Sequence, residues 1–297
     1  MHQICLLHTS RILLIISMLL FTQHTIAASK VTTTWLGMHL DDANLVLVDM
    51  ADDLQYQRFH LPGAVHLSYA ALNDTNQRGV SYSIGRKKLI MLLGLLGANS
   101  DSQIVIYDDV GGLNASRLYW ELERLGHQRF ALLDGGLVKW ILEGRKVTNM
   151  QMQPRSTTYQ PAKHEGMANL ASLAEIRRLP ADAVLLDVRT QEEYAGDPRQ
   201  PRSGHIPGAR WWPWDNTVAF TNDFRLKPTE DLKRQLQTLG VSANDPPVYL
   251  YCQTGHRASQ TYYALRQLGF SKVKIYDGSM AEYSQHKELP LKTGLMP

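Results

Sequence analysis

Short apolar runs alternate with longer amphipathic segments along most of this chain. Runs of Val, Ile and Leu predict buried strands, and apolar residues that recur every three or four positions predict helices. The expected strands are residues 45–49, 104–107, 131–133, 184–187, 248–251 and 273–276. Expected helices such as 115–125, 229–239 and 258–268 lie between them. This alternation predicts an α/β fold in which mainly parallel sheets are flanked by helices.

The pattern occurs twice, with an offset of about 140 residues, which is the size of a domain and not of a solenoid repeat. Three segments of the first half correspond to three of the second: Leu47-Val48-Asp49 to Leu185-Leu186-Asp187, His60-Leu61-Pro62-Gly63-Ala64 to His205-Ile206-Pro207-Gly208-Ala209, and Asp134-Gly135-Gly136 to Asp277-Gly278-Ser279. The polar stretch between the halves contains Pro154 and Pro161 and has no sustained period. We therefore expect domains at 29–145 and 167–297, joined by a linker at 146–166 that packs along the surface.

The N-terminus has the features of an export signal. His2, His8 and Arg11 precede an apolar core at 12–21, and small residues at 25–28 offer a cleavage site. The apolar core is too short to span a bilayer. Residues 1–28 are therefore predicted to be a signal peptide, and the mature protein is expected in the periplasm without stable membrane insertion. Removal of this segment takes Cys5 with it and leaves Cys252 as the one cysteine.

Composition narrows the classes of partner. Hydrophobic residues make up 44% of the chain and charged residues 20%, as in a globular protein with an ample core. The formal net charge is +3, with acidic and basic residues interspersed. Nucleic acid is therefore not expected as a partner. We expect a monomer that acts on small molecules.

Cys252 carries the chemistry that the sequence points to. It follows the apolar run 248–251 and opens the segment Cys252-Gln253-Thr254-Gly255-His256-Arg257, which leads into a helix. Backbone N–H groups of such a loop and the helix N-terminus stabilise an anion, here the thiolate of Cys252. Gly255 permits the unusual backbone angles that the loop needs. A nucleophilic thiolate with two basic residues beside it suits an anionic substrate, whereas a lone cysteine is more often a structural one.

These motifs together resemble the rhodanese sulfurtransferases over nearly all of the mature chain. Residues 56–67, with His60-Leu61-Pro62-Gly63-Ala64, look like the N-terminal signature of that family, and residues 276–283 resemble its second signature. Met280 departs from the family pattern, which usually has Trp or Phe there. The six-residue loop 252–257 is similar to that of bacterial thiosulfate-type members. The resemblance implies two tandem rhodanese-like domains, of which the second is catalytic.

The resemblance also implies a mechanism. Cys252 takes the sulfane sulfur of thiosulfate, sulfite leaves, and a thiophilic acceptor such as cyanide or a thiol collects the sulfur from a persulfide. Amides of residues 253–257 are expected to stabilise the charge on sulfur, and His256 and Arg257 to orient the sulfonate of the donor. No cofactor or metal is required, and no histidine has ligand spacing for zinc.

The first domain is expected to be inactive. The segment 107–112 matches the catalytic loop, and Asp108 stands where Cys252 stands in the second domain. A fixed carboxylate cannot accept sulfur and repels an anionic donor. We therefore interpret the first domain as a structural partner that closes one wall of the site.

Several other residues are weaker candidates. Arg210 and Trp214 could bind substrate, although Arg210 equally suits a surface ion pair. Trp211, Trp212 and Trp214 form an aromatic cluster, and such a cluster more often belongs to a hydrophobic core than to a substrate pocket. Asp187 and Arg189 are expected to form a structural ion pair. His60 and His205 recur in both domains, which indicates a shared role in stabilising a turn.

Three alternatives remain open at this stage. One is a 3-mercaptopyruvate sulfurtransferase, whose loop typically has small and apolar residues where this chain has Gln253, Thr254, His256 and Arg257. Another is a non-catalytic sulfur-binding module, against which the complete loop counts. The third is a cysteine-dependent phosphatase, which needs five residues between its cysteine and arginine, whereas four separate Cys252 from Arg257.

Overall fold

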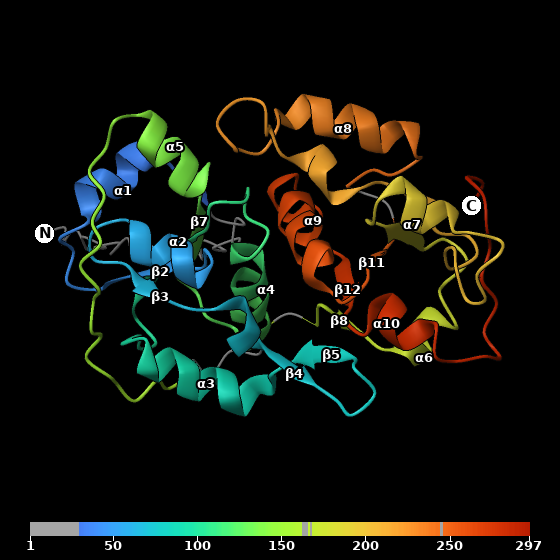
Figure 1. The fold of residues 1–297 in the computed structure, drawn as a ribbon, viewed down its shortest axis with the longest axis horizontal. Helices are drawn as coiled ribbons and strands as arrows, with labels where there is room; N and C mark the ends of the chain where they lie inside the picture. Colours follow the sequence, from blue (N-terminus) through green and yellow to red (C-terminus); the bar gives the residue numbers. More distant parts are fainter. Residues whose placement is uncertain (1–29, 162–165, 167, 244–245) are drawn as a thin grey trace, which may run out of the picture.

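The computed structural model describes residues 30–161, 166, 168–243 and 246–297 of the chain. The predicted signal peptide at 1–28 lies outside the described residues. Each half of the sequence forms a five-stranded sheet with helices around it, and the two halves lie side by side (Figure 1). Every strand pair within these two sheets is parallel, so the predicted α/β class is confirmed.

The first domain contains a sheet of strand order β1-β7-β6-β2-β3. Its elements are β1 (Lys30–Val31), α1 (Thr33–His39), β2 (Leu45–Asp49), α2 (Asp53–Arg58), β3 (Val65–His66), the 3₁₀ helix η1 (Tyr69–Leu72), the antiparallel pair β4 (Asn73–Thr75) and β5 (Ser81–Ser83), α3 (Gly85–Leu95), β6 (Gln103–Tyr107), α4 (Ala115–Leu125), β7 (Phe130–Leu133) and α5 (Gly136–Leu142).

The second domain repeats this order as β10-β9-β11-β12-β8. Its elements are β8 (Leu170–Ala171), α6 (Leu173–Ile176), β9 (Val184–Asp187), α7 (Gln191–Ala195), β10 (Arg210–Trp211), the 3₁₀ helix η2 (Trp214–Thr217), α8 (Thr229–Thr238), β11 (Val248–Tyr251), α9 (His256–Gln267), β12 (Val273–Tyr276) and α10 (Ser279–Tyr283). Strands β6 and β11 are the central strands of their sheets, which confirms the internal duplication.

Residues on each central strand alternate between two cores, as the twofold period of a strand requires. In β6, Ile104 and Ile106 belong to the core that includes α3 and α4, whereas Val105 and Tyr107 belong to the core beneath α1 and α5. All four side chains are buried. A strand buried on both faces is a continuous apolar run, which is why the sequence revealed it.

The segment after the first domain follows that domain as an extended chain. Thr148 pairs with His60, and the Thr157 N–H donates to the Gly94 carbonyl at 2.8 Å. Tyr159 is buried and its hydroxyl bonds His127. The predicted linker therefore lies along the surface, with Tyr159 anchored in the core. The domain boundaries at 145 and 166 stay predictions.

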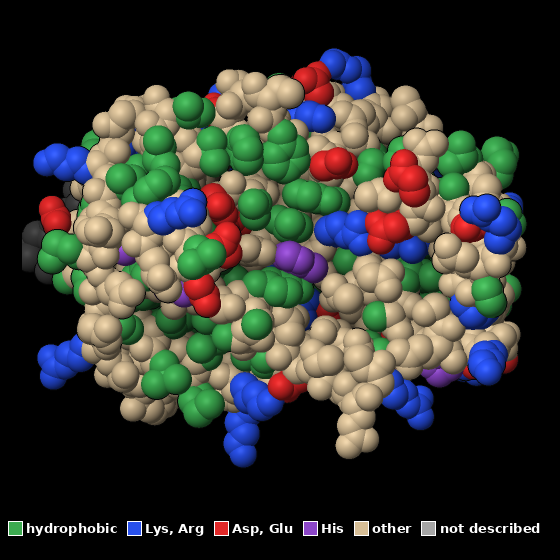
Figure 2. All heavy atoms as spheres, in the orientation of Figure 1, with side chains coloured by type: hydrophobic (Ala, Val, Ile, Leu, Met, Phe, Trp, Pro, Cys, Tyr) green, Lys and Arg blue, Asp and Glu red, His purple; other side chains and the backbone are tan. Residues whose placement is uncertain are grey.

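The domains meet along α4 and α9, which pack against each other between the two sheets (Figure 1). Tyr119 and Tyr263 make an edge-to-face contact with ring centroids 5.1 Å apart, and Arg266 forms an ion pair with Glu123 at 2.8 Å. In Figure 2 hydrophobic side chains gather along the line where the domains meet, while charges of both signs are scattered over the rest of that face. Within the described ranges, no helix has the length and apolarity to cross a membrane.

Candidate active site

Cys252 lies at the carboxyl end of the central strand β11, where ligands of parallel α/β sheets gather. Three residues, Gln253, Thr254 and Gly255, separate it from the start of α9. The cysteine is free and its side chain is completely buried. Gln253 is exposed, so the loop passes from the core to the surface within one residue. This placement confirms the strand, loop and helix that the sequence predicted around Cys252.

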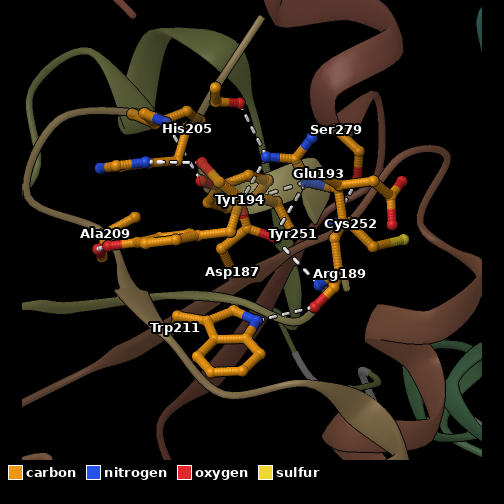
Figure 3. A network of polar contacts seen from close by, with 12 residues as sticks. Asp187, Arg189, Glu193, Tyr194, His205, Ala209, Trp211, Tyr251, Cys252 and Ser279 are labelled. Carbon is orange, nitrogen blue, oxygen red and sulfur yellow. Dashed lines mark hydrogen bonds and ion pairs between the residues drawn. The ribbon is translucent and has the colours of Figure 1, made fainter. Parts of the chain in front are cut away.

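Helix α10 fixes the shape of the loop through Ser279. The Ser279 hydroxyl accepts the N–H groups of Cys252 at 3.2 Å and Gly255 at 3.1 Å, and donates to the Tyr276 carbonyl at 2.8 Å. Ser279 adopts a left-handed backbone angle, φ +50°, which is uncommon outside glycine. Figure 3 shows this serine beside Cys252. The first domain has Gly136 at the matching position, so the hydroxyl distinguishes the two copies.

Gly255 is required at its position for two reasons. Its φ is +79°, in the left-handed region that other residues rarely adopt. A Cβ atom there would lie 2.2 Å from an Asp277 carboxylate oxygen and 3.2 Å from an Arg117 nitrogen. The loop is therefore packed directly against that pair of charged side chains, and only glycine leaves room for them.

Arg257 is held beside Cys252 by Glu193. Its two terminal nitrogens donate to the two Glu193 oxygens at 2.6 and 2.8 Å. Glu193 also forms a capping box with Thr190 at the start of α7. Burial by itself would raise the pKa of Glu193, but the bonds from Arg257 and the Thr190 N–H lower it to about 2. Burial lowers the pKa of Arg257, whereas Glu193 and the charge of a Cys252 thiolate raise it, so the guanidinium stays charged next to the sulfur.

His256 faces the first domain and carries no charge at neutral pH. Its Nε2 lies 2.8 Å from Asn114 Oδ1, and the Asn114 amide nitrogen donates to the Met50 carbonyl. Asn114 therefore presents an acceptor, and His256 Nε2–H is the donor. Burial, together with the charges of Arg117 and Arg257, lowers the pKa of His256 to about 4. That His256 binds substrate stays a prediction. A neutral ring would bind the substrate by hydrogen bonding and not by its charge.

A buried ion pair joins the domains directly behind the loop. Arg117 of α4 donates to the two Asp277 oxygens at 2.5 and 3.1 Å, and both side chains are almost fully buried. The Ser83 N–H donates to the same carboxylate at 2.6 Å. Because Gly255 packs against this pair, the first domain supports the Cys252 loop from behind. This geometry agrees with the interpretation that the first domain forms a wall of the site.

The matching loop of the first domain binds its own side chain. The Asp108 carboxylate accepts four backbone N–H groups of that loop and of the start of α4, at 2.8 to 3.0 Å, from Val110, Gly112, Asn114 and Ala115. Burial raises the pKa of Asp108, and the four N–H groups oppose that effect. In the first domain a carboxylate therefore fills the ring of loop amides, whereas in the Cys252 loop the N–H groups of Cys252 and Gly255 donate to Ser279.

Arg210 and Trp214 are both held by contacts within the second domain. Arg210 donates to the carbonyls of Leu239 and Gly240, where α8 ends. Trp214 packs against the core and contacts the edge of Phe220 with ring centroids 5.6 Å apart. These contacts tie β10 and η2 to their surroundings, and a role in substrate binding stays a prediction for both residues.

The other two tryptophans of this cluster, Trp211 and Trp212, bond groups of the second domain. Trp212 is buried in the core, and its indole N–H donates to Gln235. Trp211 donates to the carbonyl of Arg189 at 2.9 Å. Met280, the departure from the family pattern, is buried in the core of the second domain. It therefore fills core volume there.

Asp187 and Arg189 form the structural ion pair that the sequence suggested. The Arg189 guanidinium donates to Asp187 at 2.6 Å and also to the Gly204 carbonyl, and it lies over the ring of Tyr251 (Figure 3). Both charged side chains are buried. The pair holds the loop before β10 against the central strand, beside Tyr251, which precedes the cysteine.

The paired histidines stabilise equivalent turns. His60 stacks on Tyr56 and bonds the Tyr56 carbonyl through Nδ1, and His205 does the same with Tyr194, at ring distances of 3.8 Å in both cases. Both rings are buried. The turn-stabilising role inferred from their recurrence is confirmed. Among the residues that the structure describes, no group of three His, Cys, Asp or Glu side chains could hold a metal ion.

The sequence analysis missed the site residues that lie far from Cys252 along the chain. Glu193 comes from α7, Ser279 from α10, and Asn114 and Arg117 from the start of α4, so they reach the loop only in the folded chain. Ser279 did leave a signal, because it replaces the glycine of the first copy in the repeated motif Asp-Gly-Gly.

Comparisons with known proteins agree with this architecture. A family profile described as rhodanese-like domain matches residues 32–143 and 172–286. A thiosulfate sulfurtransferase of Azotobacter vinelandii is 31% identical over 258 residues, which cover 86% of this chain and 94% of the relative. The sulfur carrier protein TtuD of Thermus thermophilus is 29% identical over 284 residues, which cover 89% and 96%.

Solved structures show the same fold. Wild-type EanB superposes with a TM-score of 0.79 at 20% identity, covering 91% of this chain and 70% of that one. The 3-mercaptopyruvate sulfotransferase SseA from Escherichia coli superposes with a TM-score of 0.73 at 24% identity, covering 84% and 98%. At these identities the likeness concerns the fold alone.

Proposed function

The chain belongs to the rhodanese family, and from this premise we propose that it moves sulfane sulfur from thiosulfate to a thiophilic acceptor through a persulfide on Cys252. Two of its relatives are named thiosulfate sulfurtransferases, and a solved structure with the same fold is a 3-mercaptopyruvate sulfotransferase. The observation that carries the proposal is a free thiol at the end of β11 with a fixed guanidinium beside it. The acceptor is a small thiophile such as cyanide or a thiol.

The transfer proceeds in two balanced displacements. Cys252 Sγ attacks the outer sulfur of thiosulfate, the sulfur–sulfur bond of thiosulfate breaks, and sulfite leaves with the bonding electron pair. The acceptor then attacks the terminal sulfur of the persulfide, and Cys252 leaves as thiolate. Neither step requires a cofactor. Arg257 places a positive charge beside both the attacking sulfur and the anionic donor, which lowers the repulsion between them.

The loop favours thiosulfate over 3-mercaptopyruvate as donor. Arg257 suits the doubly charged thiosulfate through charge-assisted hydrogen bonds, and Gln253 and Thr254 add polar side chains at the loop. Parallel measurements of kcat/KM for the two donors, with cyanide as acceptor, test this assignment. We expect the higher kcat/KM for thiosulfate. A higher kcat/KM for 3-mercaptopyruvate would show that the protein is a 3-mercaptopyruvate sulfurtransferase instead.

A second candidate is a sulfur carrier that holds a persulfide for a protein acceptor. The relative from Thermus thermophilus bears the name of a sulfur carrier protein, and the full burial of Cys252 suits the protection of a persulfide. Stoichiometric persulfide formation without turnover to cyanide or small thiols would favour this function.

We also propose that the protein is exported to the periplasm and acts there as a monomer. The support is the N-terminal pattern of basic residues, apolar core and small residues. The mass of the protein purified from the periplasm tests the first part, because cleavage near residue 28 removes the initial segment. Sedimentation of that material tests the second.

A further inference from the structure

Tyr69 of the first domain reaches the catalytic loop of the second. It is the first residue of η1, and its ring lies on His256 with centroids 3.8 Å apart and planes tilted by 32°. His256 is also bound to Asn114, so two first-domain side chains contact the first residue of α9. Tyr69 is thus a neighbour of the Cys252 loop that comes from the domain without a cysteine.

The hydroxyl of Tyr69 is buried and has no hydrogen-bond partner among the described atoms. Asn73 is close enough to act on the phenol as a donor, an effect that lowers the pKa of Tyr69, but its amide nitrogen bonds the Tyr69 carbonyl at 2.7 Å. The Asn73 amide oxygen is also buried without a hydrogen-bond partner, so no hydrogen bond joins it to the Tyr69 hydroxyl, and the phenol hydrogen has no acceptor in this geometry. Leaving such a group unpaired costs about 1–3 kcal/mol, and an unpaired buried donor in a native protein calls for a partner that binds there.

The unpaired hydroxyl lies within electrostatic reach of Cys252. Burial is the main cause that raises the pKa of Tyr69; the charge of Arg117 lowers it, and the charges of a Cys252 thiolate and of Asp277 raise it further. A negative charge on Cys252 therefore interacts electrostatically with the phenol of Tyr69. Cys252 is completely buried and the Tyr69 hydroxyl is covered as well, so both groups lie away from bulk solvent.

We propose that Tyr69 donates its hydroxyl hydrogen to the terminal sulfur of the Cys252 persulfide, so that the first domain contributes a binding residue to the sulfur-loaded enzyme. This inference rests on the proposed function. A persulfide adds one anionic sulfur atom beyond Cys252 Sγ, and it supplies the acceptor that the phenol lacks. The hydroxyl has no partner in the unloaded enzyme, so its bond is gained only on loading and favours the persulfide over the free thiolate.

The test is the equilibrium between enzyme with thiosulfate and persulfide enzyme with sulfite. The full-length or mature protein is incubated with thiosulfate and sulfite at set ratios, and intact mass gives the fraction that carries the extra sulfur atom. Tyr69→Phe keeps the ring on His256 and removes the hydroxyl. We expect its equilibrium constant to shift toward the free thiol by about tenfold to 150-fold, the range for a hydrogen bond to a charged acceptor.

Tyr119→Phe is the matched control. Tyr119 is also a buried phenol without a partner for its hydroxyl among the described atoms, but it lies against Phe130 and Tyr263 at the α4–α9 contact. We expect its equilibrium constant to equal that of the wild type. An unchanged constant in Tyr69→Phe, or the same shift in both variants, overturns the inference.

The test separates this inference from the proposed function. If the wild-type protein takes no sulfur from thiosulfate, the proposed donor is wrong, and the comparison is repeated with inorganic tetrasulfide as the loading reagent. A shift in Tyr69→Phe relative to Tyr119→Phe then still supports the phenol as a partner of the persulfide. Equal loading of the two variants by tetrasulfide contradicts it.

Discussion

Single residues around Cys252 act through partners that fix them. Arg257 is the clearest case, because both of its terminal nitrogens are bound to Glu193. The pair gives the guanidinium one orientation and partly offsets its charge. The affinity for the proposed sulfur donor therefore depends on both Arg257 and Glu193, of which the sequence indicated only Arg257.

Arg257→Ala should lower kcat/KM for thiosulfate by about 1.5–3 kcal/mol of transition-state stabilisation, mainly through a higher KM. The change removes a positive charge and leaves the Glu193 carboxylate unpaired beside an anionic donor. The double variant with Glu193→Gln should recover part of the loss, because the repulsion disappears. Steady-state kinetics check both expectations; wild-type kinetics in Arg257→Ala would remove Arg257 from the site.

His256 should make the protein less stable in acid. Its pKa is about 4 in the folded protein and about 6.5 in the unfolded chain, so the unfolded chain binds the proton more readily between these values. The stability contributed by the neutral ring is complete above pH 6.5 and is lost as the pH falls toward 4. The loss from pH 7 to pH 5 should be about 2 kcal/mol.

Urea unfolding at the two pH values measures this effect as the difference between wild type and His256→Gln. The variant should lack that part of the pH dependence. Equal pH dependence in wild type and His256→Gln would show that His256 titrates normally.

At the scale of elements, the two domains share one framework and differ in what fills the loop after the central strand. In the second domain the loop contains Cys252 and is shaped by Ser279. In the first domain the Asp108 carboxylate binds the amides of the matching loop. The same arrangement of strand, loop and helix thus carries the proposed nucleophile in one copy and a buried carboxylate in the other.

Asp108→Ala should destabilise the protein by about 2–4 kcal/mol, because four N–H groups lose a buried acceptor. The folded fraction should keep substantial sulfurtransferase activity, since Asp108 does not touch the reacting sulfur. Asp109→Ala is the control and should change the unfolding free energy little. Thermal unfolding and activity per folded molecule distinguish the two effects; loss of activity in a fully folded Asp108→Ala protein would contradict this structural role.

Much of this framework could be predicted from the sequence, because buried parallel strands are continuous apolar runs. The ranges 45–49, 184–187, 248–251 and 273–276 coincide with β2, β9, β11 and β12. The edge strands β1, β3, β8 and β10 have two residues each and show no period, so they were missed. Helix α9 begins at His256, two residues before the predicted start, because Gly255 ends the loop in a left-handed conformation.

The candidate site was predictable only where it is contiguous. Residues 252–257 form one loop and carry a recognisable motif. Glu193, Ser279 and Tyr69 reach that loop through the sheet order and the packing of the domains, neither of which a local pattern reveals. The charge state of His256 was missed for the same reason, since it depends on burial beneath first-domain residues.

At the scale of the whole molecule, the interface between the domains is part of the site. The Arg117–Asp277 pair crosses that interface and lies against Gly255. Arg117→Met should lower the unfolding free energy by about 3–5 kcal/mol, because it leaves a buried carboxylate without its counter-ion. Calorimetry checks the loss, and Arg145→Met, which breaks an exposed pair with Glu143, should cost less than about 1 kcal/mol. A small effect of Arg117→Met would show that the domains hold together without this pair.

The central claim is that every transferred sulfur atom passes through Cys252. Intact mass after addition of thiosulfate without acceptor tests it most directly. The wild-type protein should gain the mass of one sulfur atom and lose it again on addition of cyanide, whereas Cys252→Ser should show neither change, because a neutral hydroxyl is a poor nucleophile toward sulfur. Steady turnover of thiosulfate and cyanide by folded Cys252→Ser would contradict the account, since the sulfur would then move directly from donor to acceptor.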